Sequence, residues 1–69
     1  MIAVYTMEIP TNTQAMQMLP LLKVLSPAAS INIDLSDGEK ILRIDGSRSS
    51  VKKIAEYLQD SGVRCEILA

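Results

Sequence analysis

The sequence predicts an α+β domain in which strands and helices follow the order strand, helix, strand, strand, helix, strand. Four segments alternate apolar and polar residues with the two-residue period of a strand. Two other segments repeat apolar residues at the three- and four-residue spacing of a helix. The 69 residues are expected to form one domain, 1–69, near the lower size at which a core holds without disulfides or metals.

The first half of this pattern predicts a strand and a helix. Residues 2–9 are rich in strand formers and alternate between two faces, so they are expected to form the first strand. A helix is expected from about Thr13 to Leu25, and Ser26-Pro27 ends it. Its predicted core stripe consists of the apolar residues at helical spacing, namely Ala15, Met18, Leu22 and Leu25.

Pro20 lies inside this first helix. Beyond the first turn a proline removes one hydrogen bond, here to the carbonyl of Met16, and costs about 3 kcal/mol relative to alanine. We therefore expect the helix to bend. The alternative is a helix that begins later, with Pro20 near its first turn and a separate short turn over residues 13–19.

The second half predicts a hairpin, a helix and a last strand. Apolar residues alternate over 31–35 and 42–44, with turn chemistry at 36–39 between them. Ser49 or Ser50 is expected to cap the second helix, and Ser61-Gly62 ends it. The stripe of this helix comprises Val51, Ile54, Ala55 and Leu58, and the last strand turns inward Val63, Cys65 and Ile67. Two such units predict a ferredoxin-like βαββαβ sandwich, a four-stranded antiparallel sheet with both helices on one face.

Composition argues against several functions. The chain has no histidine and one cysteine, so the usual hydrolase and zinc constellations cannot be assembled, and we expect neither an enzyme nor a cofactor. A net charge of −1 gives no general attraction for nucleic acid. The first residues do not resemble a signal peptide and no apolar run is long enough for a membrane span, which indicates a cytoplasmic protein.

Two stretches, "SINIDLSDGEKILRI" and "SSVKKIAEYLQDSGVRCEIL", are similar to the central hairpin and the second helix with last strand of the heavy-metal-associated domain, the fold of copper chaperones. The resemblance covers nearly the whole chain. It implies a soft-metal site in the loop after the first strand, where the family carries two cysteines three positions apart. Those positions hold Thr11 and Gln14 here, and neither can replace a thiolate. The resemblance therefore implies the fold without the metal motif.

Thr11 and Gln14 match a helix capping box instead. In this motif the threonine hydroxyl accepts from the backbone N–H three residues on, and the glutamine side chain reaches back to the N–H of the threonine. Thr13 is the competing cap.

The first helix is apolar nearly all round. Lys23 is the only charged residue between Ile9 and Ala29, so a free monomer would expose an apolar surface. We expect a non-enzymatic protein-interaction or regulatory module that binds a protein partner, or a second copy, through the first helix. The expected contacts, on the face opposite the core stripe and on its flank, are Met16, Leu19, Pro20 and Val24.

Two other functions compete with this one. Soft-metal binding would use the methionines Met7, Met16 and Met18 or an intermolecular Cys65. Methionine usually serves as core filler, however, and Cys65 is expected to be a small core residue. Anion binding would use the start of the second helix, with Arg48, Ser49, Ser50, Lys52 and Lys53. The alternative interpretation of that cluster is a solvated face with a serine cap.

Overall fold

The computed structural model describes residues 1–35 and 40–68. Its elements in chain order are β1 (Ile2–Glu8), α1 (Asn12–Leu25), β2 (Ser30–Asp34), β3 (Ile41–Asp45), α2 (Arg48–Ser61) and β4 (Arg64–Ile67). An α+β chain with four antiparallel strands and two helices is thereby confirmed. The turn predicted at residues 36–39 lies outside the described residues.

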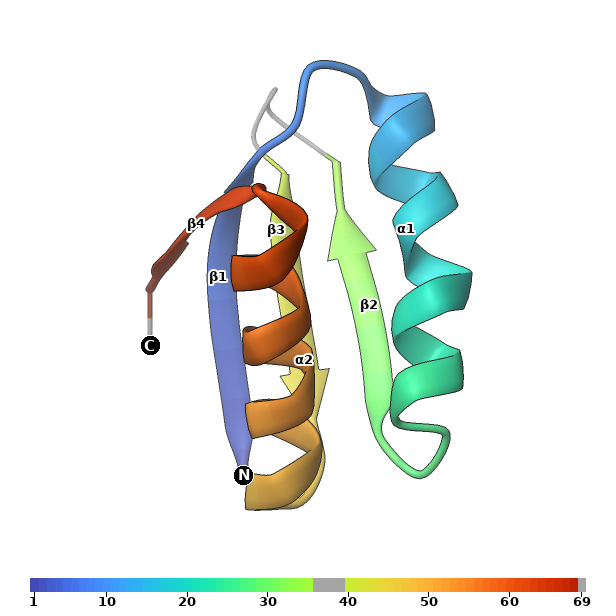
Figure 1. Cartoon of the computed structure of the whole chain (residues 1–69), viewed down its shortest axis with the longest axis vertical. Coiled ribbons are helices and arrows are strands. Elements are labelled where there is room, and N and C mark those ends of the chain that lie inside the picture. Colours follow the sequence, from blue (N-terminus) through green and yellow to red (C-terminus); the bar gives the residue numbers. More distant parts are fainter. Residues whose placement is uncertain (36–39, 69) are drawn as a thin grey trace.

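The four strands form one antiparallel sheet in the order β2-β3-β1-β4, so β1 is flanked on both sides and β4 lies at an edge (Figure 1). Alternate residues of β1 form backbone hydrogen bonds with β3 on one side and with β4 on the other. The N–H of Met7 donates to the carbonyl of Lys40 beside β3 at 2.9 Å, whereas the carbonyl of Val4 accepts from Leu68, just after β4, at 2.8 Å. Odd-numbered residues of β1 therefore bond toward β3 and even-numbered residues toward β4.

The core lies between one face of the sheet and the two helices. Its strand residues are Ala3, Tyr5, Met7, Ile31, Ile33, Leu42 and Ile44, and its helix residues are Ala15, Leu22, Val51, Ile54 and Leu58. Both helices cover this face, with α1 alongside β2 (Figure 1). The opposite face carries exposed polar side chains such as Asn32, Arg43 and Asp45. The apolar periods of the hairpin and of α2 are thus confirmed.

Helix α1 is one continuous helix that contains Pro20 well inside it, so the alternative of a later start is wrong. Its core stripe differs from the predicted one at the last position. Leu25 is 37% exposed, whereas Ser26 is buried and its hydroxyl donates to the carbonyl of Ser50 at 3.5 Å. Ser26 follows Leu22 by four residues and so lies over the same face, where α2 supplies an acceptor for its hydroxyl.

The N-cap of α2 is Ser47, which corrects the expectation of Ser49 or Ser50. The Ser47 hydroxyl accepts from the N–H of Ser50 at 3.1 Å, and Ser49 and Ser50 lie in the first turn. The helix ends as expected at Gly62, whose φ of 81° is left-handed and suits glycine.

Gly46, just after β3, lies very close to Ala29, just before β2. A Cβ added there would lie 2.9 Å from the Cβ of Ala29, so the backbone would have to shift. We expect Gly46→Ala to lower the free energy of unfolding by about 1–3 kcal/mol, measured by urea denaturation. The double variant Gly46→Ala/Ala29→Gly lacks the opposing methyl group. Its loss in the free energy of unfolding should be smaller than the sum of the losses of the two single variants. Strict additivity would contradict the proposed contact.

Candidate functional site

The loop between β1 and α1, residues 9–11, is where the resembling family carries its metal site. Thr11 is the N-cap of α1, with extended backbone, and its hydroxyl accepts from the N–H of Gln14 at 3.1 Å. The carbonyl of Thr11 accepts from Ala15 at 3.2 Å. Thr11, not Thr13, is therefore the cap, and the half of the capping box that involves its hydroxyl is confirmed. The Thr11 side chain, which the resemblance would place at the first metal-ligand position, is engaged in starting the helix.

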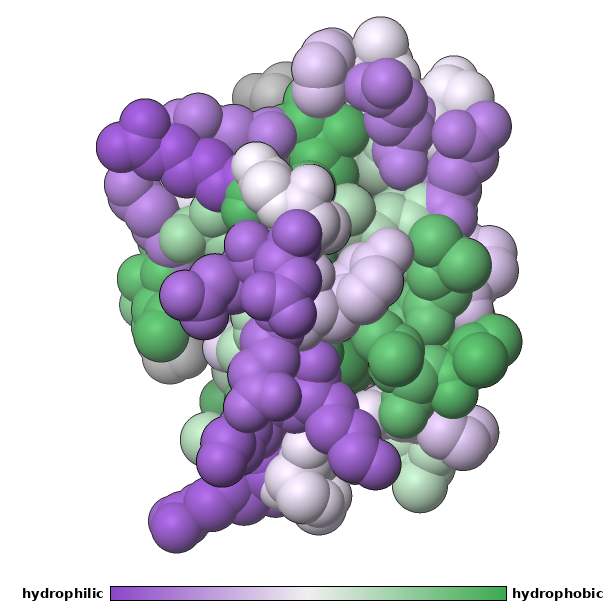
Figure 2. Space-filling view, viewed as in Figure 1, coloured by the Kyte–Doolittle hydropathy of each residue, from purple (hydrophilic) through white to green (hydrophobic). Residues whose placement is uncertain are grey.

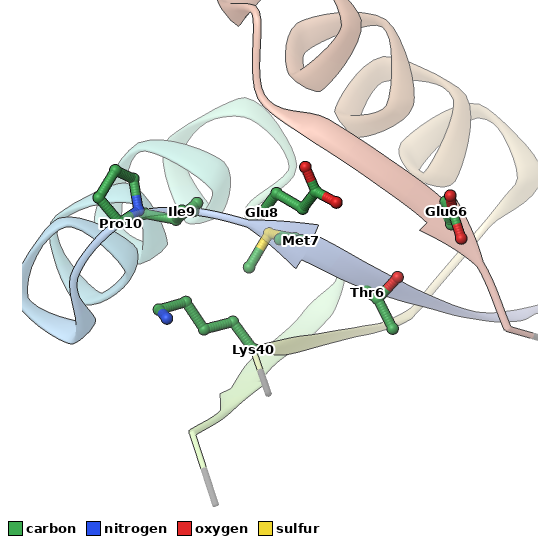
Figure 3. Close-up of a pocket in the computed structure, with 7 residues that line it drawn as sticks. All are labelled: Thr6, Met7, Glu8, Ile9, Pro10, Lys40 and Glu66. Atoms are coloured by element: carbon green, nitrogen blue, oxygen red, sulfur yellow. The ribbon is translucent and has the colours of Figure 1, made fainter. Parts of the chain in front are cut away.

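A shallow hollow lies beside this loop, at the end of β1 (Figure 3). It is lined by Thr6, Met7, Glu8, Ile9, Pro10, Lys40 and Glu66. The Lys40 ammonium reaches toward the loop at Pro10, whereas the Glu8 carboxylate points away from it toward β4, which carries Glu66 (Figure 3). The charged groups of this hollow therefore do not converge on one point. Across residues 1–35 and 40–68, no three histidine, cysteine, aspartate or glutamate residues are grouped as metal ligands would be.

The methionines proposed as soft-metal ligands are separated. Met7 is buried in the core and borders the hollow at the end of β1. Met18 lines a different hollow with Gln14 and Gly62, and Met16 lies on the outer side of α1 beside Pro20. The three methionines therefore border three different hollows.

Cys65 lies on β4 opposite Met7 and is half-buried, so it is less enclosed than a core residue. Its thiol lies 3.7 Å from the carbonyl of Val63 and is placed to donate a weak hydrogen bond to it. Burial raises the pKa of the Cys65 thiol, which keeps it protonated and weakens it as a nucleophile. Ile67, expected to turn inward with it, is 71% exposed.

The serines of the candidate anion-binding cluster, at the start of α2, contact one another. Besides capping Ser50, the Ser47 hydroxyl lies 3.2 Å from that of Ser49 and donates to that of Ser50 at 3.1 Å. Arg48, Lys52 and Lys53 are exposed. The hydroxyls nearest the helix start thus contact one another, which agrees with a solvated face with a serine cap.

The outer side of α1 carries the clearest candidate surface. Val24 is 79% exposed, Leu21 53% and Met16 45%. Figure 2 shows hydrophobic residues gathered over the second half of α1. Pro20 is also exposed, but Leu19 is partly buried and packs against the core. We define the α1 outer face as the exposed apolar residues Met16, Pro20, Leu21, Val24 and Leu25.

The sequence reasoning therefore placed three of these five residues. It assigned Leu25 to the core stripe and did not count Leu21 among the contacts, and it included Leu19, which packs against the core. The hydrophobic stripe of α1 can be set in more than one rotation, because few polar residues mark its solvent side. In the observed rotation Ser26, four residues after Leu22, occupies the buried position that Leu25 was expected to fill.

Comparisons with family models, with curated proteins and with solved structures gave no match. Among the described residues, no helix is both long enough and apolar enough to cross a bilayer.

Removing the Thr11 cap should cost measurable stability. Thr11→Ala leaves the N–H of Gln14 without its side-chain acceptor, and we expect a loss of about 1 kcal/mol in the free energy of unfolding. Thr13→Ala, in the first turn of the same helix, is the matched control and should change stability by less than about 0.5 kcal/mol. A larger loss from Thr13→Ala than from Thr11→Ala would contradict the cap assignment.

Proposed function

We propose that this chain is a non-enzymatic protein-interaction or regulatory module of the cytoplasm, with a ferredoxin-like fold of the heavy-metal-associated type. The fold proposal is supported by the sheet order β2-β3-β1-β4 and by the two helices on one face. It is also supported by the position of Thr11 and Gln14, which hold the helix start where a metal-binding member would carry thiolates.

The observation that carries the functional proposal is the exposure of the α1 outer face. Apolar side chains are exposed along successive turns of a helix whose single charged residue is Lys23. Helix α2 shows the ordinary alternative, because its solvent side carries charged residues including Lys52, Lys53, Glu56 and Asp60. Both helices pack on the same sheet face, so packing does not explain the difference. Burial by a partner protein with an apolar surface does explain it.

The geometry also suggests how such a partner would bind. Met16, Pro20 and Val24 follow one another at four-residue intervals, and Leu21 and Leu25 repeat the interval beside them. This arrangement is a ridge about two helical turns long. A groove or a second helix lined with aliphatic side chains would cover it, as in helix-in-groove recognition.

The exposed side chain of Val24 offers a test of this surface. Val24→Glu should weaken retention on a hydrophobic-interaction column and remove partner-induced shifts of the α1 amides in NMR titrations, because it places a charge on the ridge at a side chain that is 79% exposed. The free energy of unfolding should change by less than about 0.5 kcal/mol, since Val24 is exposed. Gln17→Glu adds the same charge to an exposed position on the same helix and is the control. Equal retention of wild type and Val24→Glu would contradict the proposal.

The resemblance to the heavy-metal-associated family offers a separate test. In a Cys65→Ser background, changing Thr11 and Gln14 together to cysteine should create copper(I) binding, measured by competition with a chromophoric copper(I) chelator. The control is Thr13→Cys/Met16→Cys, which has the same spacing but begins two residues later. A folded Thr11→Cys/Gln14→Cys variant that does not compete with the chelator would show that this loop is not equivalent to the family's metal loop.

A further inference from the structure

The outer edge of β4 presents backbone groups that no strand of the described chain pairs with. In the β1–β4 ladder Thr6 lies opposite Glu66, and the N–H of Leu68 donates to Val4. Because hydrogen-bonding residues alternate along an antiparallel strand, Arg64 and Glu66 direct their N–H and C=O toward β1. Cys65 and Ile67 direct theirs outward. The edge therefore offers donors and acceptors to a further strand.

Apolar side chains accompany this edge on the helix side. Cys65 lies opposite Met7, and Ile67 lies opposite Tyr5, so both belong to the face that the helices cover. Ile67 is nevertheless 71% exposed, because β4 is the edge strand and runs outward past the part of the sheet that α2 covers (Figure 1). A groove between β4 and α2 continues past these side chains to Ala55. An added strand would cover apolar surface as well as pair its backbone.

The opposite face of β4 carries one charge of each sign. Arg64 lies opposite Glu8 and Glu66 opposite Thr6 on β1, so both side chains point away from the helices. Suppose a second β4 lies antiparallel with its Cys65 directly opposite Cys65. The Arg64 side chain then faces Glu66 of the second copy, and Glu66 faces the second copy's Arg64. These are non-hydrogen-bonded pairs, in which side chains approach most closely, so both contacts are attractive.

Like-charge repulsion disfavours the registers in which the two β4 strands are shifted by two residues. A shift of two residues in one direction places Arg64 opposite Arg64, and in the other direction Glu66 opposite Glu66. A shift of one residue would exchange the outward and inward backbone groups. Self-pairing through β4 is thus complementary in one register and repulsive in the two adjacent ones.

We propose that two copies of this chain associate by antiparallel pairing of β4 with β4, centred on Cys65, so that one continuous sheet runs through both copies. The pairing is symmetric, since each copy contributes the same edge. The α1 outer face is unaffected, because α1 lies alongside β2 at the other edge of the sheet. The dimer would present two such faces. The interface is a short strand, so the association is weak and depends on concentration.

Charge-reversal variants test this register. Glu66→Arg gives each strand two positive charges, and Arg64→Glu gives it two negative ones. We expect the association constant of each variant alone to be lower than that of wild type by a factor of about ten or more, measured by sedimentation equilibrium. An equimolar mixture should form a heterodimer at least as tight as the wild-type dimer, because every facing pair is then opposite in charge.

Matched controls separate this effect from net charge and from folding. Glu56→Arg and Lys53→Glu make the same charge changes on the exposed side of α2 and should leave dimerisation unchanged. Thermal unfolding of each variant establishes that it is folded. This matters most for Arg64→Glu, which places a second carboxylate opposite Glu8. A wild-type chain that stays monomeric at millimolar concentration, or a mixture that does not associate, would overturn the proposal.

A disulfide between the two Cys65 residues is a direct test of the register. Opposite residues of a hydrogen-bonded pair have Cα atoms about 5.5 Å apart, within the range a disulfide spans. Treatment with diamide should link the two thiols, which lose two protons and two electrons as the N=N bond of diamide is reduced to a hydrazide. In the mixture of charge variants the linked product should be the heterodimer by mass. Homodimeric products in random proportion would contradict the charge-selected register.

Discussion

The structure depends on β1 being paired along both of its edges. Its odd-numbered residues bond toward β3 and its even-numbered residues toward β4, while Ala3, Tyr5 and Met7 point into the core. A slip of one residue would exchange the two hydrogen-bonding sets and turn the core side chains to solvent. The register of β1 therefore determines the packing of both helices. It also determines which backbone groups of β4 remain at the outer edge.

The two surfaces proposed for interaction lie toward opposite edges of this sheet and differ in chemistry. The α1 outer face offers aliphatic side chains, whose burial is favourable but not directional. The β4 edge offers backbone donors and acceptors whose partners must lie in register. One surface is therefore suited to variable apolar partners, and the other to a strand of defined sequence. Because they do not overlap, a chain can use both at once.

Much of the fold could be predicted because β2, β3 and α2 have clear periods, with buried Ile31, Ile44 and Leu58 separated by exposed polar residues. The buried face of helix α1 was harder to predict, because apolar residues occur on most sides of the helix and more than one face could pack against the core. The N-cap of α2 was predicted wrongly because serines occur at positions 47, 49 and 50, all close to the start of the helix. In the structure the helix begins at Arg48, so Ser47 is the cap. The β4 edge could not be found from sequence, because spatial strand order and alternation of hydrogen bonds appear only in the assembled sheet.

The central place of β1 has a consequence for synthesis of the chain. β1 is made before the other three strands of the sheet, but its even-numbered residues find their partners only in β4, the last of the four. Until residues 64–68 leave the ribosome, one whole side of β1 is an unpaired edge beside apolar side chains. During synthesis the domain is thus most exposed to wrong strand pairing along β1, and the addition of residues 64–68 removes that hazard.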